Sequence, residues 1–205
     1  MTKNCQLIVG LDVDTRDEAL RAVEICGACV WFKIGSQLFT RCGPDIVREV
    51  RDRGKQVFLD LKYHDIPNTV AGAVHAARDL GVSLLTLHAA GGARMIAAAR
   101  EAVEGSPARL LAVTVLTSLT EEALRTEVGL PETPAEAVRR YARLAVSAGA
   151  HGLVASPHEI EAIREEVGPD PLVVTPGIRP VWASADDQAR ILTPREAAER
   201  GADFI

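Results

Sequence analysis

Charged side chains crowd one short stretch of the chain, DLKYHDIP at residues 60–67, directly after an apolar run at residues 57–59. A short apolar run bounded by turn signals predicts a buried strand, whose side chains alternate between two faces. Asp60 and Lys62 therefore share a face, which puts a carboxylate beside an ammonium, and Asp65 follows where the chain turns. Because such charges are rarely buried unless paired or used, the stretch indicates either a structural salt bridge or a site of chemistry.

Two further charged residues occupy equivalent places on the preceding predicted strands. Asp12 follows the apolar run at residues 6–11, and Lys33 lies near the end of the run at residues 30–34. If the strands are parallel and close into a barrel, these side chains meet Asp60 and Lys62 at one mouth, where barrel enzymes carry their chemistry. Four such residues on three consecutive strands favour a functional site over an isolated salt bridge.

A second candidate region is the loop TPGIR at residues 175–179. Gly177 gives it flexibility and free backbone N–H groups, and Arg179 suits a phosphate group through its planar fork of donors. Phosphate sites in barrels commonly follow strands seven and eight, although a surface loop with a solvated arginine has the same sequence. Gly91 and Gly92 could likewise hold an anion at a helix start or form a plain turn.

Other residues that often carry chemistry have ordinary interpretations here. His64 and His88 come near the predicted mouth as strand-end structural groups, and Ser156 is interpreted as a helix cap because it lacks the setting of a nucleophile elbow. Cys26 and Cys29 have no second ligand pair at zinc spacing, and the five histidines show no metal-binding spacing. We therefore predict no metal site.

The elements that must position the charged residues alternate regularly between strands and helices. Apolar runs predict strands near residues 6–11, 30–34, 56–61, 84–88, 109–116, 152–155, 172–175 and 204–205. Capping and Pro or Gly signals predict the intervening helices near residues 15–28, 43–53, 68–80, 93–103, 133–148, 156–167 and 193–200. The alternation implies a parallel sheet, and units of about 25 residues favour a (β/α)8 barrel over a doubly wound sheet.

No linker or low-complexity segment interrupts the alternation, so residues 1–205 are predicted to form a single α/β barrel domain. The chain stops about two residues into the eighth predicted strand. A complete barrel needs that strand to remove its open edges, and a helix normally follows it. We therefore expect a C-terminal end that is truncated, with strand eight cut short.

Composition narrows the classes of function. Apolar residues make up 47% of the 205 residues, charged residues 25%, and the formal net charge is -5. No basic stripe or motif indicates nucleic-acid binding, and no apolar run approaches the roughly 18 residues of a membrane span. The N-terminus lacks an apolar signal core, so a cytoplasmic location is expected, without nucleic-acid or membrane partners.

The stretch at residues 60–67 resembles the D-x-K-x-x-D-I-P signature of orotidine 5'-phosphate decarboxylase, of the short bacterial type. Further matches occur in the family's order and spacing over nearly the whole chain: LD at residues 11–12, FKIG at 32–35, HAAGG at 88–92, LTS at 116–118, TPGIR at 175–179 and DQ at 187–188. The short D-x-K-x-x-D motif alone is shared with sugar-phosphate decarboxylases of the same superfamily, and the full combination is narrower.

The resemblance implies cofactor-free decarboxylation of orotidine 5'-monophosphate to uridine 5'-monophosphate, the last step of de novo pyrimidine synthesis. It implies that Lys62 donates the proton that replaces the carboxylate at C6 and that Asp60 lies against the departing carboxylate. It assigns Lys33 and Asp12 to the ribose and the charge network. The flanking carboxylates would hold Lys62 as an ammonium, the state a proton donor needs.

The same resemblance implies a homodimer in which Asp65, Ile66 and Thr69 reach the neighbouring subunit's site. Thr117 would contact the pyrimidine, and Arg179 and Gln188 would serve the phosphate end, with the loop after Pro176 as a lid. The family also carries a Gly-Arg pair a few residues into strand eight, whose Arg grips the phosphate. This sequence ends before that pair.

Three alternatives stay open at the level of sequence. A decarboxylase of the same superfamily would act on an open-chain sugar phosphate and use a metal ion. A barrel aldolase would use Lys62 as a Schiff-base nucleophile, which its flanking carboxylates argue against. A non-catalytic barrel would bind a phosphoribosyl nucleotide without turnover.

Overall fold

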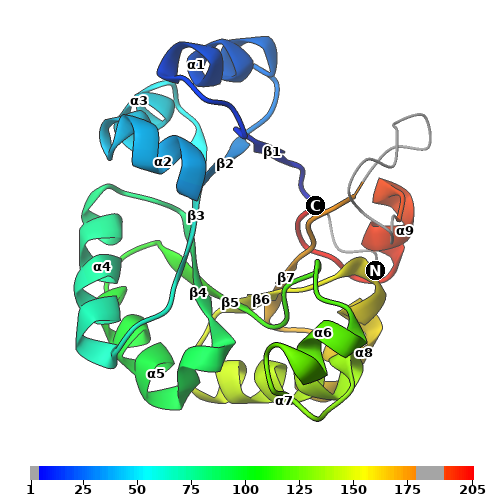
Figure 1. Cartoon of the computed structure of the whole chain (residues 1–205). Coiled ribbons are helices and arrows are strands. Elements are labelled where there is room, and N and C mark those ends of the chain that lie inside the picture. The colour runs from blue at the N-terminus through cyan, green and yellow to red at the C-terminus, as the bar shows by residue number, and fades with distance from the viewer. Residues whose placement is uncertain (1–4, 179–191) are drawn as a thin grey trace.

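The computed structural model describes residues 5–178 and 192–205 of the chain. Within them, seven parallel strands form one sheet in which each strand pairs with the next along the chain. Helices surround the strands in an outer ring (Figure 1), so the predicted (β/α)8 barrel architecture is confirmed. The strands are β1 Ile8–Gly10, β2 Trp31–Gly35, β3 Gln56–Tyr63, β4 Leu84–His88, β5 Arg109–Val113, β6 Gly152–Val154 and β7 Leu172–Val174.

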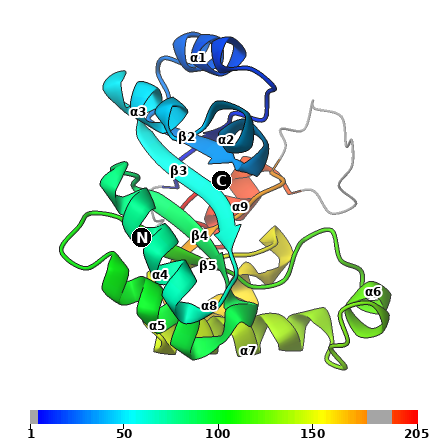
Figure 2. The same ribbon diagram turned by 60° about the vertical axis from the view of Figure 1, so that its left-hand side comes forward.

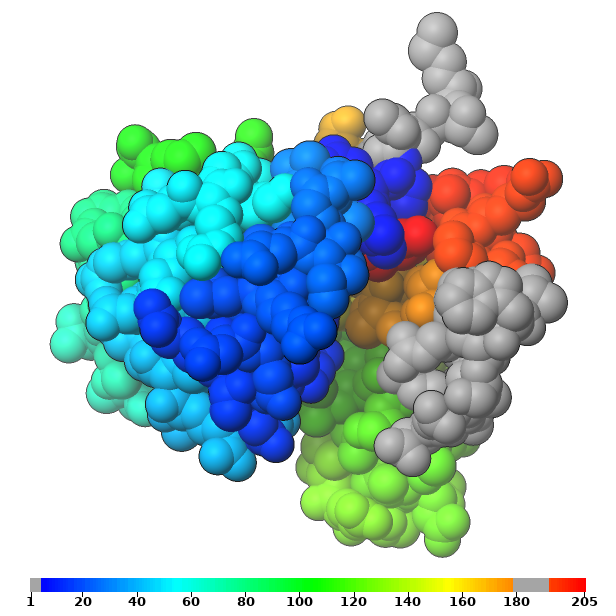
Figure 3. Space-filling view, turned by 90° about the horizontal axis from the view of Figure 1, so that it is seen from above, coloured from blue at the N-terminus to red at the C-terminus, as the bar shows by residue number. Residues whose placement is uncertain are grey.

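The last residues of the chain lie between the first and last strands of the sheet. Phe204 forms parallel bridges with both Gln6 and Val174. The Ile8 N–H donates to the carbonyl of Ile205 at 2.8 Å, and the Thr175 N–H donates to that of Phe204 at 3.0 Å. Residues 204–205 therefore occupy the place of strand eight, as predicted, and Asp203, whose carbonyl accepts the Gln6 N–H at 2.9 Å, extends this segment by one residue. Figure 3 shows the end of the chain (red) against its N-terminal part (blue).

Most helices begin where capping signals predict. Thr15 and Thr133 accept hydrogen bonds from the backbone of the following turn in capping boxes, and Ser156 caps the short 3₁₀ helix η2 as predicted. Two short helices, α2 and α6, were not predicted. The helices are α1 Arg16–Ile25, α2 Ser36–Cys42, α3 Asp45–Asp52, α4 Pro67–Asp79, α5 Gly92–Ala102, α6 Glu121–Thr126, α7 Pro134–Ser147, α8 Ile160–Val167 and α9 Pro194–Glu199, with 3₁₀ helices η1 Ala89–Gly91 and η2 Pro157–Glu159.

Two apolar layers hold the barrel together. A small cluster fills its interior, built from alternate strand residues that include Phe58, Leu84, Leu111, Val174 and Phe204. A much larger cluster packs the other face of the strands against the helices. This alternation of faces carries every second residue of a strand inward, so it also decides which side chains reach the mouth. No helix in the described ranges is both long and apolar enough to cross a membrane.

One arginine ties the end of the chain to the rest of the barrel. The Arg164 side chain, on α8, donates to the carbonyl of Pro171 at 2.6 Å and to that of Gly201 at 2.7 Å. It also donates to Asp203 Oδ2 at 2.7 Å, and the same carboxylate oxygen accepts the N–H of Val173 at 2.8 Å. Arg164 thus joins α8, the approach to β7 and the strand-eight segment.

Candidate active site

The predicted pair of charges at the end of β3 is present. Phe58 faces the barrel interior, and alternation carries Asp60 and Lys62 to the same side. Lys62 Nζ lies 2.9 Å from Asp60 Oδ2, and the side chains are 36% and 13% exposed. The carboxylate is thus largely enclosed while its ammonium partner still reaches solvent, as a group that meets a substrate must. Figure 2 shows β3 leading into α4 at this end of the barrel.

A buried hydroxyl from the neighbouring strand forms hydrogen bonds with both residues of this pair. The hydroxyl of Thr86, on β4, donates to Asp60 Oδ1 at 2.9 Å and accepts the backbone N–H of Lys62 at 2.9 Å. Sequence reasoning misses Thr86, because one hydroxyl inside an apolar run carries no spacing signal. The only sign is that a fully buried polar side chain needs partners.

The second predicted pair joins the segment after β1 to β2. Lys33 Nζ lies 2.9 Å from Asp12 Oδ1, and the Leu11 N–H donates to the Lys33 carbonyl at 2.9 Å. Glycines leave room for this pair, since a Cβ on Gly10 would come within 2.8 Å of Asp12 Oδ2 and one on Gly35 within 3.4 Å of Lys33 Nζ. This ion pair therefore connects the segment after β1 to the middle of β2, and β2 is the neighbour of the strand that carries Asp60 and Lys62.

Beyond β3, the chain turns and exposes the residues predicted to serve a neighbouring subunit. Asp65 Oδ1 accepts the N–H of Ile66 at 2.6 Å, which fixes the turn before α4. Ile66 is 66% exposed, and Asp65 and Thr69 are exposed as well. These three residues follow the Asp60–Lys62 pair in the sequence, and all three are exposed on the surface.

Two histidine rings stack beside the mouth. The centroids of His64 and His88 are 5.4 Å apart, with a tilted arrangement. Burial lowers the pKa of His88, nearby His64 and Lys62 lower it further, and Asp60 acts in the opposite direction. His88 is therefore neutral at pH 7 and forms an uncharged wall next to the Asp60–Lys62 pair.

Of the three remaining predicted residues, one lies in the described part of the chain. Thr117 is exposed in the segment between β5 and α6. Arg179 and Gln188, predicted for a phosphate group, lie outside the described residues, as does most of the predicted lid. Within residues 5–178 and 192–205, no three His, Cys, Asp or Glu side chains form a group that could hold a metal ion.

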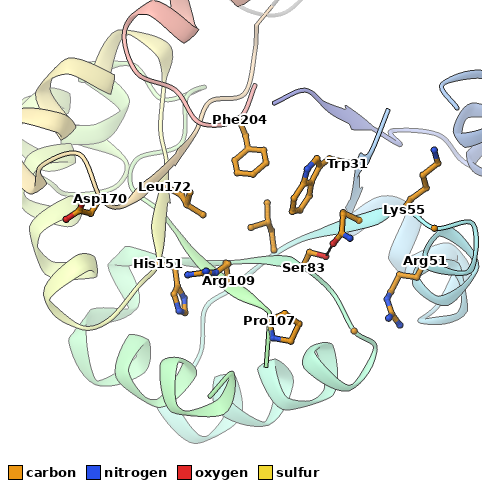
Figure 4. A pocket seen from close by; sticks show the side chains of 14 residues that line it. Trp31, Arg51, Lys55, Ser83, Pro107, Arg109, His151, Asp170, Leu172 and Phe204 are labelled. Carbon is orange, nitrogen blue, oxygen red and sulfur yellow. Dashed lines mark hydrogen bonds between the residues drawn. The ribbon is translucent and has the colours of Figure 1, made fainter. Parts of the chain in front are cut away.

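A cavity of about 810 Å³ lies at the opposite end of the barrel (Figure 4). It is lined by the first residues of five strands, Trp31, Gln56, Leu84, Arg109 and Leu172. In barrels, the N-terminal ends of strands serve stability and the C-terminal ends serve chemistry. The site is therefore assigned to the charged mouth, whose four charged residues do not line this cavity.

Chemically, the mouth presents alternating carboxylates and ammonium groups on three adjacent strands. An ammonium held against a carboxylate is a positioned proton donor, and fixed charges of both signs can stabilise a developing carbanion. Residues 5–205 match the model of the Orotidine 5'-phosphate decarboxylase / HUMPS family. The chain belongs to this family.

Relatives in the orotidine 5'-phosphate decarboxylase family cover nearly the whole chain. An orotidine 5'-phosphate decarboxylase of Heliobacterium modesticaldum is 50% identical over 98% of this chain and 86% of its own length. One from Syntrophotalea carbinolica is 51% identical over 98% of this chain and 85% of its own. The crystal structure of orotidine 5'-phosphate decarboxylase from Lactobacillus acidophilus is 37% identical, with a TM-score of 0.85 over 98% of this chain and 89% of that one.

Proposed function

We propose that this protein decarboxylates orotidine 5'-monophosphate to uridine 5'-monophosphate and CO2 without a cofactor, as the last step of pyrimidine synthesis. The observation that carries the proposal is the Asp60–Lys62 pair at the C-terminal end of β3, in a chain about 50% identical to proteins named for this activity. A cytoplasmic location stays a prediction of the sequence.

The proposed step breaks the bond between C6 and the carboxylate and leaves an electron pair on C6, which then takes a proton. Lys62 supplies that proton from its ammonium group, 2.9 Å from Asp60 in the structure. Asp60 faces the departing carboxylate, and the repulsion between them disappears as CO2 leaves. The fixed charges favour the carbanion-like state, which contributes to the roughly 8–23 kcal/mol by which enzymes lower barriers.

The other predicted residues are proposed to bind the substrate. Lys33 and Asp12 hold the ribose and keep the charges in register, supported by their 2.9 Å contact. Thr117 contacts the pyrimidine, and Arg179 and Gln188 bind the phosphate. Binding energy from the phosphate end can then be expressed at the distant reacting carbon.

The proposed assembly is a homodimer of single-domain barrels, each comprising residues 1–205. Asp65, Ile66 and Thr69 reach the neighbouring site and act there with Lys62. The exposure of Ile66, a large apolar side chain directly beside the mouth, supports this arrangement, because a partner subunit would cover it.

Turnover tests the proposal directly. The loss of substrate absorbance is followed for the wild type, Lys62→Ala and the control Lys55→Ala. Removing the proton donor is expected to lower kcat by about 10²–10⁴-fold or more. Lys55 precedes the same strand at its other end and donates to the carbonyl groups of Gly27 and Cys29, so its variant should keep turnover.

Each result has a defined meaning. Absence of turnover by the folded wild-type protein would refute the decarboxylase assignment, whereas unchanged turnover by Lys62→Ala would refute only the role of Lys62. Turnover that a chelator abolishes would favour the metal-dependent sugar-phosphate decarboxylase. That alternative is not favoured by the names of the relatives.

A further inference from the structure

Thr86 occupies an unusual position for a polar residue. It lies in the middle of β4, Leu84–His88, where the other residues up to Leu87 are apolar, and its side chain is fully buried. A buried hydroxyl without partners is destabilising, so its hydrogen bonds define what it does. Both of its partners belong to the proposed catalytic pair on β3.

The direction of these two hydrogen bonds is fixed by chemistry. The backbone N–H of Lys62 can only donate, so the Thr86 oxygen accepts it at 2.9 Å. The hydroxyl proton is then free for Asp60 Oδ1, at 2.9 Å. Since Asp60 Oδ2 already accepts the Lys62 ammonium at 2.9 Å, each oxygen of this carboxylate has its own donor. The result is a closed ring of hydrogen bonds through Thr86, Asp60 and Lys62.

The backbone explains why such a support is needed at this point. Strands β3 and β4 pair regularly at Leu59 and Leu85, but the next pair is Tyr63 with Leu87, so β3 carries extra residues in a bulge. Lys62 lies in this bulge with a φ of 51°, the single positive value among non-glycine residues in the described part of the chain. That conformation is unfavourable for lysine and persists only where its surroundings hold it.

We infer that Thr86 is a positioning residue for the proposed decarboxylation. Its hydroxyl accepts the backbone N–H of Lys62 at the bulge and at the same time orients the Asp60 carboxylate. The relative position of the proton donor and the carboxylate is thereby set by one side chain from a neighbouring strand. The expected effect on kcat rests on the proposed function. The expected effect on the geometry of Asp60 and Lys62 rests on the hydrogen bonds alone.

Three variants separate this role from a merely structural one. Thr86→Val keeps the shape and removes both hydrogen bonds, Thr86→Ser keeps the hydroxyl, and Thr114→Val is the control. Thr114 is also a buried threonine, directly after β5, and its hydroxyl donates to the backbone carbonyl of Val154 at 3.2 Å.

We expect Thr86→Val to lower kcat by about 10- to 100-fold, because a small misplacement of reacting groups has effects of this size. KM should change little, since the proposed phosphate and ribose contacts lie on other strands. Thr86→Ser should restore a kcat close to that of the wild type, and Thr114→Val should resemble the wild type. If Thr86→Val does not fold, Thr86→Ala replaces it with the same expectation.

The inference is overturned if Thr86→Val keeps the wild-type kcat, or if Thr86→Ser loses as much as Thr86→Val. A crystal structure of Thr86→Val supplies a readout that needs no activity. A broken Asp60–Lys62 contact or a Lys62 φ outside the left-handed region supports the inference, and unchanged geometry at both residues refutes it. Lack of turnover by the wild type would refute the proposed function instead and leave this structural test decisive.

Discussion

The side chain of His151, the residue before β6, binds the backbone of β5 at the end of the barrel opposite the charged mouth. His151 Nδ1 accepts the backbone N–H of Leu110 at 3.0 Å, a role that requires an unprotonated nitrogen. Burial lowers the pKa of His151 to about 4, with smaller effects from the positive charges of Arg100 and Arg109. In the unfolded chain this histidine takes up a proton near its ordinary pKa of about 6.5, so the folded and unfolded states differ in bound protons.

This difference predicts how stability depends on pH. Because the folded-state pKa is the lower one, the contribution of His151 is complete above about pH 6.5 and is lost as the pH falls towards 4. His151→Gln, whose amide oxygen can still accept the Leu110 N–H, should lose less stability over this interval than the wild type. Urea unfolding at about pH 7.5 and about pH 4.5 measures the change. His158→Gln, at an exposed site, is the matched control. Equal losses for His151→Gln and the wild type would contradict the prediction.

Sequence predicts side-chain direction well and backbone irregularity poorly. Alternation along β3 was enough to place Asp60 beside Lys62, and strand order was enough to bring Asp12 and Lys33 to the same end. The bulge and the positive φ of Lys62 depend on how β3 pairs with β4, which no local pattern of residues contains. Thr86 was missed for the same reason, since its role appears only across strands.

The local sequence predicts some helices more clearly than others. Helices that begin with a capping box, such as α1 at Thr15 and α7 at Thr133, carry their signal locally and were predictable. Helix α2 follows β2 directly and has no side-chain cap, so nothing marks its start. Helix α6 is a six-residue segment in a long connection, where tertiary packing decides whether so short a helix forms.

The contacts of Arg164 predict how much α8 contributes to closing the barrel. Arg164→Met removes the positive charge that pairs with Asp203, a carboxylate that is only 12% exposed and that keeps the hydrogen bond from the Val173 N–H. Breaking a pair that is largely enclosed in this way is expected to lower the free energy of unfolding by about 3 kcal/mol, the lower end of the cost for a fully buried pair. The matched control is Arg139→Met, which removes the exposed Arg139–Glu165 pair and should lower it by less than about 1 kcal/mol. Urea unfolding compares the two, and similar losses would refute the assignment of Arg164 as the link.

At the scale of the whole molecule, the proposed homodimer makes the activity of one chain depend on another. Neither Lys62→Ala nor Asp65→Ala should be active alone. If Asp65 acts across the interface, a mixed dimer of the two variants contains one intact site. Random mixing should therefore restore about a quarter of wild-type turnover. Mixing after reversible dissociation, with turnover as the readout, tests this, and refolded Lys62→Ala alone is the control. No recovery in a mixture shown to contain mixed dimers would place Asp65 in its own chain's site.

The bridge from Phe204 to both Gln6 and Val174 also affects how the protein is made. A ribosome that adds roughly 5–20 residues per second takes roughly 10–40 seconds to proceed from Gln6 to Phe204. During that time β1 has β2 on one side and an open hydrogen-bonding edge on the other. Such an edge can pair with other nascent chains, so aggregation is expected to be most pronounced until the segment around Phe204 has been made and can cover it.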